Sequence, residues 1–261
     1  MAGYNQQKVN SRQRFENFDN WLTSRIGQVW LNTEIECLNP VLESIFGIFS
    51  GVCTGGSGSA LLEKSLIHYP FFVSPYTINH SAVNQMVCDL CCWPVESQSL
   101  DLVVLHHTLE LVTRPHFLLR EATRTVSPEG KLVIIGVNPW SLYYCLQYML
   151  VKQYRLWDRI PAISARRLTD WLTLLGYRIE NICYGAHGFP FQDMFFKKIF
   201  KKKSQHGLSG YFRYDFSRLP VGAFYIIIAS REESGMIPLK SCWRPIRKRF
   251  KRPTVIGPTT G

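Results

Sequence analysis

Two apolar segments separated by an amphipathic helix constrain the fold of this chain more than any other feature. Residues 100–105 (LDLVVL) and 131–136 (KLVIIG) are almost continuously apolar, as in strands that are buried on both faces of a sheet. Between them, residues 110–125 place Leu118 and Ala122 on one face of a helix. A strand, a helix and a strand in this order form a crossover unit whose two strands are parallel. The segment therefore predicts a parallel α/β sheet.

The remaining apolar patterns supply further elements on both sides of this unit. Aromatic residues recur at helical spacing near the N-terminus, Ser164 is a typical helix N-cap, and Gly176 is a typical helix stop. The other expected elements are helices over 15–30, 34–46 (interrupted by Pro40), 60–67, 138–157 and 166–175, an apolar run over 45–53, and strands over 71–73, 177–183 and 223–229.

The charge of the chain is concentrated at its C-terminal end. The formal net charge is +11. Residues 1–196 contain 15 Lys and Arg against 16 Asp and Glu, a net of −1, whereas residues 197–261 contain 15 against 3, a net of +12. Most of this charge lies in Lys197–Lys203 and Lys240–Arg252. These runs predict attachment to RNA or to an anionic membrane surface, or a solvated tail that promotes solubility.

The N-terminus and the cysteines indicate a cytoplasmic location. The first 15 residues contain no apolar stretch, so we expect no signal peptide, and no run approaches the roughly 18 apolar residues of a membrane span. We expect the eight cysteines to be reduced thiols. Cys88, Cys91 and Cys92 lack the second pair that a zinc site needs, so we predict buried free thiols there and no metal site.

A longer pattern runs through residues 88–139. Its members are Asp89, Pro94, Ser99, Asp101, His107, Leu109, Glu110, Pro115, Leu119, Glu121, Arg124, Pro128 and Gly130. The pattern resembles the segment around the fourth strand of class I methyltransferases that depend on S-adenosylmethionine (SAM). Within that family it is most similar to the type 11-like methyltransferase domain. A narrower similarity, to a little-characterised bacterial subgroup, runs through residues 21–47, 137–146 and 167–177.

The resemblance implies an α/β fold with a doubly wound, mostly parallel seven-stranded sheet, helices on both faces and an antiparallel last strand. A helical extension would precede it. The expected domains are an N-terminal helical cap (1–44), a methyltransferase-like domain (45–235) and a basic flexible tail (236–261). The implied activity is methyl transfer from SAM to an acceptor that the sequence does not identify.

The resemblance also implies where the cofactor binds. The glycine cluster after the apolar run 45–53 corresponds to the family loop, in which glycine lets the backbone approach the ligand closely. Its cofactor-binding candidates are Gly55, Gly56 and Gly58. Asp89 matches the acid that bonds the adenine amino group, and Leu90 follows it.

Two histidines follow the expected strand 100–105, where the family holds the sulfonium and methionine ends of SAM. We expect His106 to line the cofactor site. We expect His107 to be the catalytic base, because imidazole titrates near neutral pH. The alternative is that both histidines pack or cap the adjoining helix.

Two acids of the family pattern are missing. No acid lies between Ser44 and Leu62 at the first strand, and none lies between Phe71 and Val87 at the second. Each lost charge-assisted hydrogen bond would cost roughly 1.5–3 kcal/mol of SAM affinity. An alternative function is therefore a degenerate methyltransferase-like protein that lacks efficient catalysis. It would engage nucleic acid, membrane or a protein through its basic C-terminal region.

Overall fold

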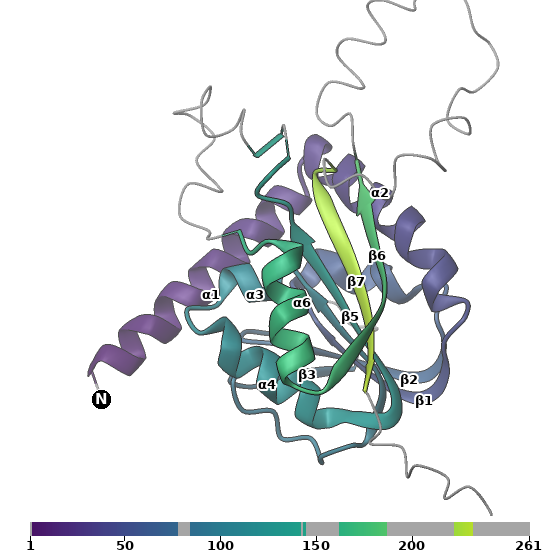
Figure 1. Cartoon of the computed structure of the whole chain (residues 1–261). Coiled ribbons are helices and arrows are strands. Elements are labelled where there is room, and N and C mark those ends of the chain that lie inside the picture. The colour runs from purple at the N-terminus through teal and green to yellow at the C-terminus, as the bar shows by residue number, and fades with distance from the viewer. Residues whose placement is uncertain (1, 78–83, 142, 145–161, 187–221, 232–261) are drawn as a thin grey trace, which may run out of the picture.

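A seven-stranded sheet forms the centre of the molecule (Figure 1). The computed structural model describes residues 2–77, 84–141, 143–144, 162–186 and 222–231. The strands are β1 (Phe46–Cys53), β2 (Leu66–Ser74), β3 (Gln85–Val87), β4 (Leu100–His106), β5 (Val126–Val137), β6 (Tyr177–Gly185) and β7 (Phe224–Arg231). Their order across the sheet is β3-β2-β1-β4-β5-β7-β6. The first five strands are parallel, and β7 runs antiparallel to both β5 and β6. The predicted fold class is therefore confirmed.

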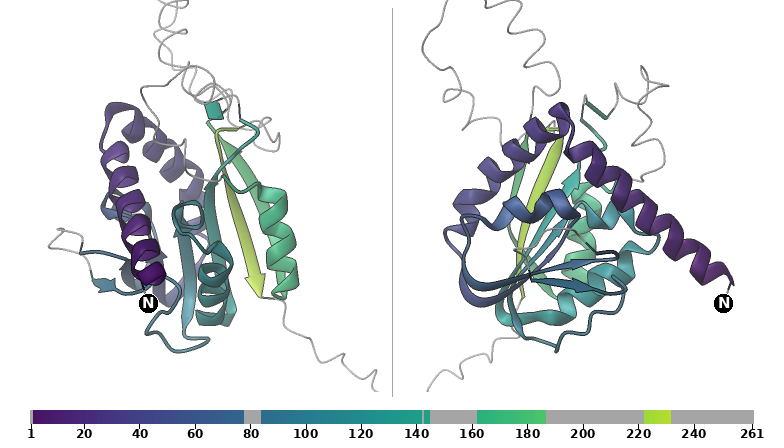
Figure 2. Two further views of the ribbon diagram at one scale, coloured as in Figure 1. Left: turned by 90° about the vertical axis from the view of Figure 1, so that its left-hand side faces the viewer. Right: turned by 180° about the vertical axis from the view of Figure 1, so that it is seen from behind.

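Helices cover both faces of this sheet, as near-continuous apolar strands require. They are α1 (Ala2–Leu22), α2 (Arg25–Leu42), α3 (Thr108–Leu111), α4 (Pro115–Thr125), α6 (Ala165–Leu174) and the 3-10 helix η1 (Gly56–Leu62). Figure 2 shows α1 and α2 on one face of the sheet and α6 on the other. Among the described residues, no helix is both long and apolar enough to cross a membrane.

The N-terminal helices share one hydrophobic core with the sheet. Fully buried side chains of α1 and α2 belong to the same cluster as those of β4, β5 and β7. The members from the two helices are Phe15, Phe18, Leu22, Trp30, Leu31, Leu38 and Leu42. The core is continuous across residue 44, and the division into a cap (1–44) and a methyltransferase-like domain (45–235) stays a prediction. The predicted tail 236–261 lies outside the described residues.

The connection from β1 to β2 differs from the prediction. The sequence predicted a helix-like stretch over 60–67 and a short strand over 71–73. Instead, η1 ends at Leu62, and β2 already begins at Leu66 and pairs in parallel with β1. The aromatic residues of β2 have high strand propensity, and pairing with β1 satisfies their backbone.

The helix predicted over 110–125 is divided. Helix α3 ends at Leu111, and α4 begins at Pro115. Proline is favoured in the first turn of a helix but disfavours helical backbone in the residue before it, so it fixes the new start. In contrast, Pro40 does not interrupt α2, which continues to Leu42. Most of the predicted helix 138–157 lies outside the described residues.

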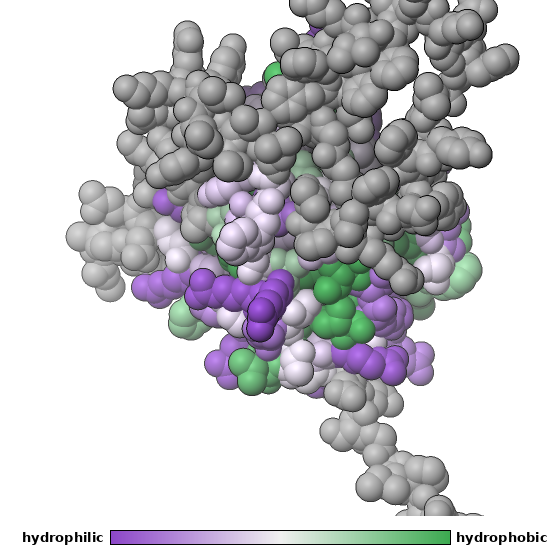
Figure 3. Space-filling model, turned by 45° about the horizontal axis from the view of Figure 1, so that its top comes forward, coloured by the Kyte–Doolittle hydropathy of each residue, from purple (hydrophilic) through white to green (hydrophobic). Residues whose placement is uncertain are grey.

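The amino ends of β1 and β2 carry exposed apolar side chains. Phe46 is 74% exposed and Tyr69 is 60% exposed, and the rings of Phe49 and Tyr69 lie 5.7 Å apart. The carboxyl ends of both strands are buried. In Figure 3 the top of the molecule is turned toward the viewer. The described residues on that face present both hydrophobic and hydrophilic side chains. The buried chemistry of the molecule therefore lies toward the carboxyl ends of the strands.

Candidate functional site

The carboxyl ends of β1 and β4 meet at the centre of the sheet. Cys53, the last residue of β1, is in register with Leu105 of β4. The strand order reverses between these two neighbours, because β2 and β3 lie on one side and β5 on the other. In open α/β sheets, ligands bind beyond the carboxyl ends of the strands at such a switch point. Thr54, the glycine loop and the two histidines all lie here.

The glycine loop packs closely against its surroundings. A Cβ atom on Gly58 would lie 1.9 Å from Thr54 Oγ1, and one on Gly55 would lie 3.1 Å from Asp19 Oδ1. The backbone N–H of Gly56 donates a hydrogen bond to Asp19 Oδ2 at 3.0 Å. The carboxylate of Asp19, on α1, therefore contacts the loop that was predicted to hold the cofactor.

Asp19 also reaches the end of the second strand. Burial raises the pKa of Tyr76, which follows β2, and the charge of Asp19 raises it further. The sequence has no acid within β1 or β2 at this edge. Helix α1 thus brings a negative charge to a place where the two strands supply none.

A fully buried cluster joins α2 to the end of β4. One carboxylate oxygen of Glu34, Oε2, lies 3.0 Å from His106 Nε2, and the other, Oε1, lies 2.7 Å from His107 Nε2. The side chains of all three residues are 0% exposed. Trp30, one turn before Glu34 on α2, donates its Nε1–H to Glu34 Oε1 at 2.5 Å. On the other side, His106 Nδ1 lies 2.9 Å from Thr54 Oγ1.

The backbone of His107 explains how two adjacent residues reach one carboxylate. Neighbouring side chains in a strand point to opposite faces of the sheet. His107 has left-handed backbone angles, φ 53° and ψ 14°, which turn the chain directly after β4. Its imidazole ring then lies 4.7 Å from that of His106, centroid to centroid.

The electrostatics of the cluster favour one ion pair and one neutral imidazole. Burial raises the pKa of Glu34, but the charge of His107 and hydrogen bonds from both histidines outweigh it and lower the pKa to about 2. Burial lowers the pKa of His106. Burial acts in the same direction on His107, but the charge of Glu34 and its hydrogen bond outweigh it and raise the pKa of His107. These shifts favour the ionised form of Glu34 and the protonated form of His107.

Glu110 is a second buried carboxyl group near this cluster. It is 1% exposed, and its Oε1 accepts a hydrogen bond from Val137 N at 2.7 Å. Burial raises the pKa of Glu110. Within the part of the chain that the structure describes, Glu110 Oε2 has no hydrogen-bond partner. Glu110 is thus a buried, fold-supporting residue of the 88–139 pattern and not a solvated surface charge.

The loop after β3 holds Asp89 and Leu90. Asp89 Oδ1 accepts a hydrogen bond from Cys91 N at 3.0 Å, which closes a tight turn. Leu90 is buried, and its carbonyl oxygen accepts a hydrogen bond from Trp93 Nε1 at 2.9 Å. The adenine-binding role of Asp89 stays a prediction.

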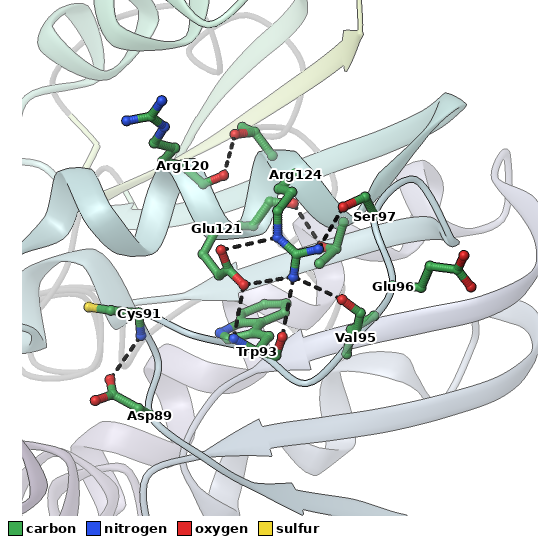
Figure 4. A network of polar contacts seen from close by, with 12 residues as sticks. Asp89, Cys91, Trp93, Val95, Glu96, Ser97, Arg120, Glu121 and Arg124 are labelled. Carbon is green, nitrogen blue, oxygen red and sulfur yellow. Dashed lines mark hydrogen bonds and ion pairs between the residues drawn. The ribbon is translucent and has the colours of Figure 1, made fainter.

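Glu121 and Arg124 of α4 fix the rest of this loop (Figure 4). The backbone N–H of Trp93 donates to Glu121 Oε1 at 2.9 Å, and Arg124 donates to Glu121 and to the carbonyl of Val95. A further bond, of 2.7 Å, runs from Arg124 to the hydroxyl of Ser97. These two family-pattern residues therefore support the loop. Asp101 is also structural, because its Oδ2 accepts hydrogen bonds from the backbone of β1.

The cysteine prediction needs one correction. The thiols are free where the structure describes them, but Cys92 is exposed, and Cys88 and Cys91 are half-buried. They project from an irregular loop and not from a strand facing the core. A different group, Glu34 with His106 and His107, brings three ligand atoms within 4.8 Å of one another and could hold a metal ion.

Four residues of the site were not predicted from the sequence: Asp19, Trp30, Glu34 and Thr54. A usable signal existed for the acids, because Asp19 and Glu34 each lie on the apolar stripe of an amphipathic helix, where a charge needs a partner. The identity of those partners was not readable, since Glu34 and His106 are 72 residues apart.

Comparisons with known proteins agree with this architecture. Residues 51–134 match the family described as "Methyltransferase domain". The chain has the fold of the class I SAM-dependent methyltransferases, which confirms the predicted resemblance.

Among curated proteins, the chain is 35% identical over 95 residues to the uncharacterized protein YafS of Escherichia coli (strain K12). That match covers 36% of this chain and 40% of YafS, so it spans less than half of the relative.

Solved structures of low sequence identity share the fold. A SAM-dependent methyltransferase of Thermotoga maritima, described as a possible histamine N-methyltransferase, has a TM-score of 0.58 at 16% identity. The superposition covers 84% of this chain and 100% of that one. A SAM-dependent methyltransferase of Archaeoglobus fulgidus has a TM-score of 0.54 at 16% identity, over 77% of this chain and 94% of that one. Geranyl diphosphate C-methyltransferase of Streptomyces coelicolor A3(2), in complex with Mg²⁺, geranyl diphosphate and S-adenosyl-L-homocysteine, has a TM-score of 0.50 at 15% identity, over 77% and 79%.

Proposed function

We propose that this chain is a SAM-dependent methyltransferase with an acceptor still to be identified. The observation that carries the proposal is the match of residues 51–134 to a methyltransferase domain, within a sheet of matching topology. That matched segment contains the glycine loop, the Asp89 loop and both histidines. A structural neighbour that binds the demethylated cofactor supports SAM as the methyl donor. No finding supports the degenerate binding protein as an alternative.

The proposal assigns the cofactor to the carboxyl ends of β1 and β4. Gly55, Gly56 and Gly58 would lie along its methionine part, with His106 beside them. Asp89 and Leu90 would lie at its adenine. The protein needs mainly to align the acceptor with the methyl group, because the sulfonium already activates that carbon.

Asp19 supplies the acid that the strands lack. The methionine part of SAM carries an ammonium group, which needs a hydrogen-bond acceptor of negative charge. Asp19 accepts a hydrogen bond from Gly56 N and lies against Gly55, so its carboxylate is already beside the predicted loop. We propose that it binds the ammonium group. Helix α1 would then be part of the cofactor site as well as part of the core.

Calorimetric titration with SAM and with S-adenosyl-L-homocysteine tests both statements. We expect the wild-type protein to bind both ligands in the micromolar range. Asp19→Asn should weaken binding by about tenfold or more, because a charge-assisted hydrogen bond contributes roughly 1.5–3 kcal/mol. Glu36→Gln, which removes the same charge from an exposed position of α2, is the matched control.

The two possible failures are distinct. If the wild-type protein binds neither ligand at millimolar concentration, the methyltransferase proposal fails. If it binds SAM and Asp19→Asn binds equally well, the role of Asp19 is wrong while the function stands.

Three predictions from the sequence remain proposals. His107 as the catalytic base has a clear geometric condition: its side chain is fully buried against Glu34, so an acceptor could reach it after α2 moves. RNA or an anionic membrane surface as a partner rests on Lys197–Lys203 and Lys240–Arg252, which lie outside the described residues. A cytoplasmic location rests on the cysteines, which are free thiols wherever the structure describes them.

A further inference from the structure

We infer that Glu34, His106 and His107 form a binding site for one divalent transition-metal ion, and that Zn²⁺ fits their ligand set best. The inference does not depend on SAM binding or on methyl transfer. It rests on the ligand types, on their convergence, on the backbone that produces this convergence and on the groups around them.

The ligand types suit zinc. Two imidazole nitrogens and one carboxylate are a common protein ligand set for zinc, with a further position left for water. The same set also occurs around non-haem iron, so the chemistry is that of a borderline divalent ion. Each residue here offers one ligand atom, and all three side chains are 0% exposed.

The ligand atoms already lie near the separations of a metal centre. Ligand atoms about 2.0–2.1 Å from a tetrahedral zinc ion lie roughly 3.3 Å from one another. The two nitrogen–oxygen separations here are 2.7 and 3.0 Å, and all the ligand atoms lie within 4.8 Å of one another. Shifts of up to about 1.5 Å between ligand atoms would therefore be enough to admit an ion.

The backbone at His107 is arranged for this convergence. Its positive φ of 53° is uncommon for a residue other than glycine. Such strained positions cluster where a structure holds a ligand or performs chemistry. Without this turn, the two histidines would point to opposite faces of the sheet. The chain thus accepts local strain to bring both rings to one carboxylate.

The surrounding groups orient the ligands as outer partners of a metal do. A histidine that binds metal through one nitrogen usually hydrogen-bonds through the other. His106 Nδ1 lies 2.9 Å from Thr54 Oγ1, and a hydroxyl can donate to this nitrogen or accept from it. Trp30 Nε1 holds Glu34 Oε1. His106 can therefore bind an ion through Nε2 without losing its partner at Nδ1.

Glu34 contacts both histidines, and a second buried carboxyl group, Glu110, lies near His107. The charge of Glu110 acts on His107 together with that of Glu34, and Glu110 Oε2 has no hydrogen-bond partner among the described residues. Buried charges normally require a paired charge or a coordinated metal. A divalent ion held by Glu34 and the two histidines would fasten α2 to the end of β4.

Metal titration of the full chain, expressed without a histidine tag and stripped with a chelator, tests the inference. We expect one equivalent of Zn²⁺ to bind in calorimetry and to raise the melting temperature. Co²⁺ bound at this site should give the absorption spectrum of a Co²⁺ ion with nitrogen and oxygen ligands. The spectrum should lack the charge-transfer band that a thiolate ligand would add. This readout uses the wild-type chain alone, so it holds even where a variant folds poorly, and it separates the site from the cysteines.

Substitutions locate the ion. Glu34→Gln and His106→Asn should each weaken Zn²⁺ binding by about 100-fold or more, because outer-shell changes alone cost roughly 10–100-fold. Thr54→Val, an outer partner, should weaken it by about 10–100-fold. His68→Asn and His116→Asn alter exposed histidines elsewhere and should leave binding unchanged.

Three results would each overturn the inference. The first is that the wild-type protein binds no equivalent of Zn²⁺ or Co²⁺, which would make the cluster a hydrogen-bonded part of the core. The second is a thiolate band in the Co²⁺ spectrum, which would place the ion at the cysteines. The third is equal binding by the wild-type protein and by folded Glu34→Gln. If the site is confirmed, His107 cannot also be the catalytic base, since its Nε2 would be bound to the ion.

Discussion

At the scale of single residues, Glu121 and Arg124 tie a long loop to a helix. Arg124 donates five hydrogen bonds, two of them to the carboxylate of Glu121, at distances from 2.7 to 3.2 Å. Three of the accepting groups belong to the loop residues Trp93, Val95 and Ser97. Burial raises the pKa of Glu121, but hydrogen bonds from Arg124 and from Trp93 N outweigh it, and the pKa is lowered overall.

We expect this pair to contribute to acid sensitivity. A folded-state pKa below the ordinary value of 4.5 stabilises the fold above that pH, and the contribution is lost as the pH falls through the folded-state pKa. Glu121→Gln should therefore be less stable than the wild-type protein at pH 7, and the difference should shrink below about pH 4.5. Urea unfolding between pH 7 and pH 3 measures it. A difference that stays constant over this range would show that the Glu121 carboxylate is not perturbed.

The site residues were predictable to different degrees. The positions of the glycine loop and the two histidines, directly after apolar strands, were predictable from local pattern, whereas their cofactor and catalytic roles came from the family resemblance and stay predictions. Asp19 and Glu34 were not, because their partners are fixed by tertiary packing, with Gly56 lying 37 residues beyond Asp19. The pKa shifts that Glu34 and His107 cause in each other were unpredictable for the same reason, because tertiary packing brings the two residues together.

At the scale of elements, the corner between α1 and α2 is set by Gly27. A Cβ atom there would lie 2.2 Å from the carbonyl oxygen of Trp21 and 2.6 Å from Leu22 Cα. Both contacts are with backbone atoms, so a side chain at this position would force α1 and α2 apart. Ser24 caps α2 at the same corner by accepting a hydrogen bond from Gly27 N at 3.1 Å.

We expect Gly27→Ala to destabilise the protein by about 1–3 kcal/mol, as overpacking does. Ser24→Ala removes the cap without a clash and should cost about 1 kcal/mol. Val29→Ala, at an exposed position of α2, is the control. Chemical denaturation of the three variants ranks them, and a neutral Gly27→Ala would mean that the corner can relax.

The elements themselves show where sequence patterns succeed. β4, α4 and β5 were predicted because each has a strong periodic signal and short connections. The segment from Gly56 to Ser74 was assigned partly to a helix, because its apolar residues fit either period over so short a stretch. Parallel pairing with β1 decides the matter, and that contact is not local.

At the scale of the whole molecule, the N-terminal helices complete the fold. Their side chains share the core with the sheet, and Glu34 pairs with His107 inside it. We expect deletion of residues 1–44 to expose this apolar face and leave His107 without its carboxylate. The shortened chain should be insoluble or should bind an apolar dye, as measured by solubility and dye fluorescence. A soluble chain with cooperative unfolding would support an independent cap domain.

The pairing of Glu34 with His106 also has a consequence during synthesis. The two residues are 72 positions apart, so at roughly 5–20 residues per second the ribosome adds His106 about 4–14 s after Glu34. Until then, α2 has emerged with a charged group on its apolar face and no sheet to receive it. The nascent helices are therefore a natural target for chaperones, and docking of α2 has to wait for β4.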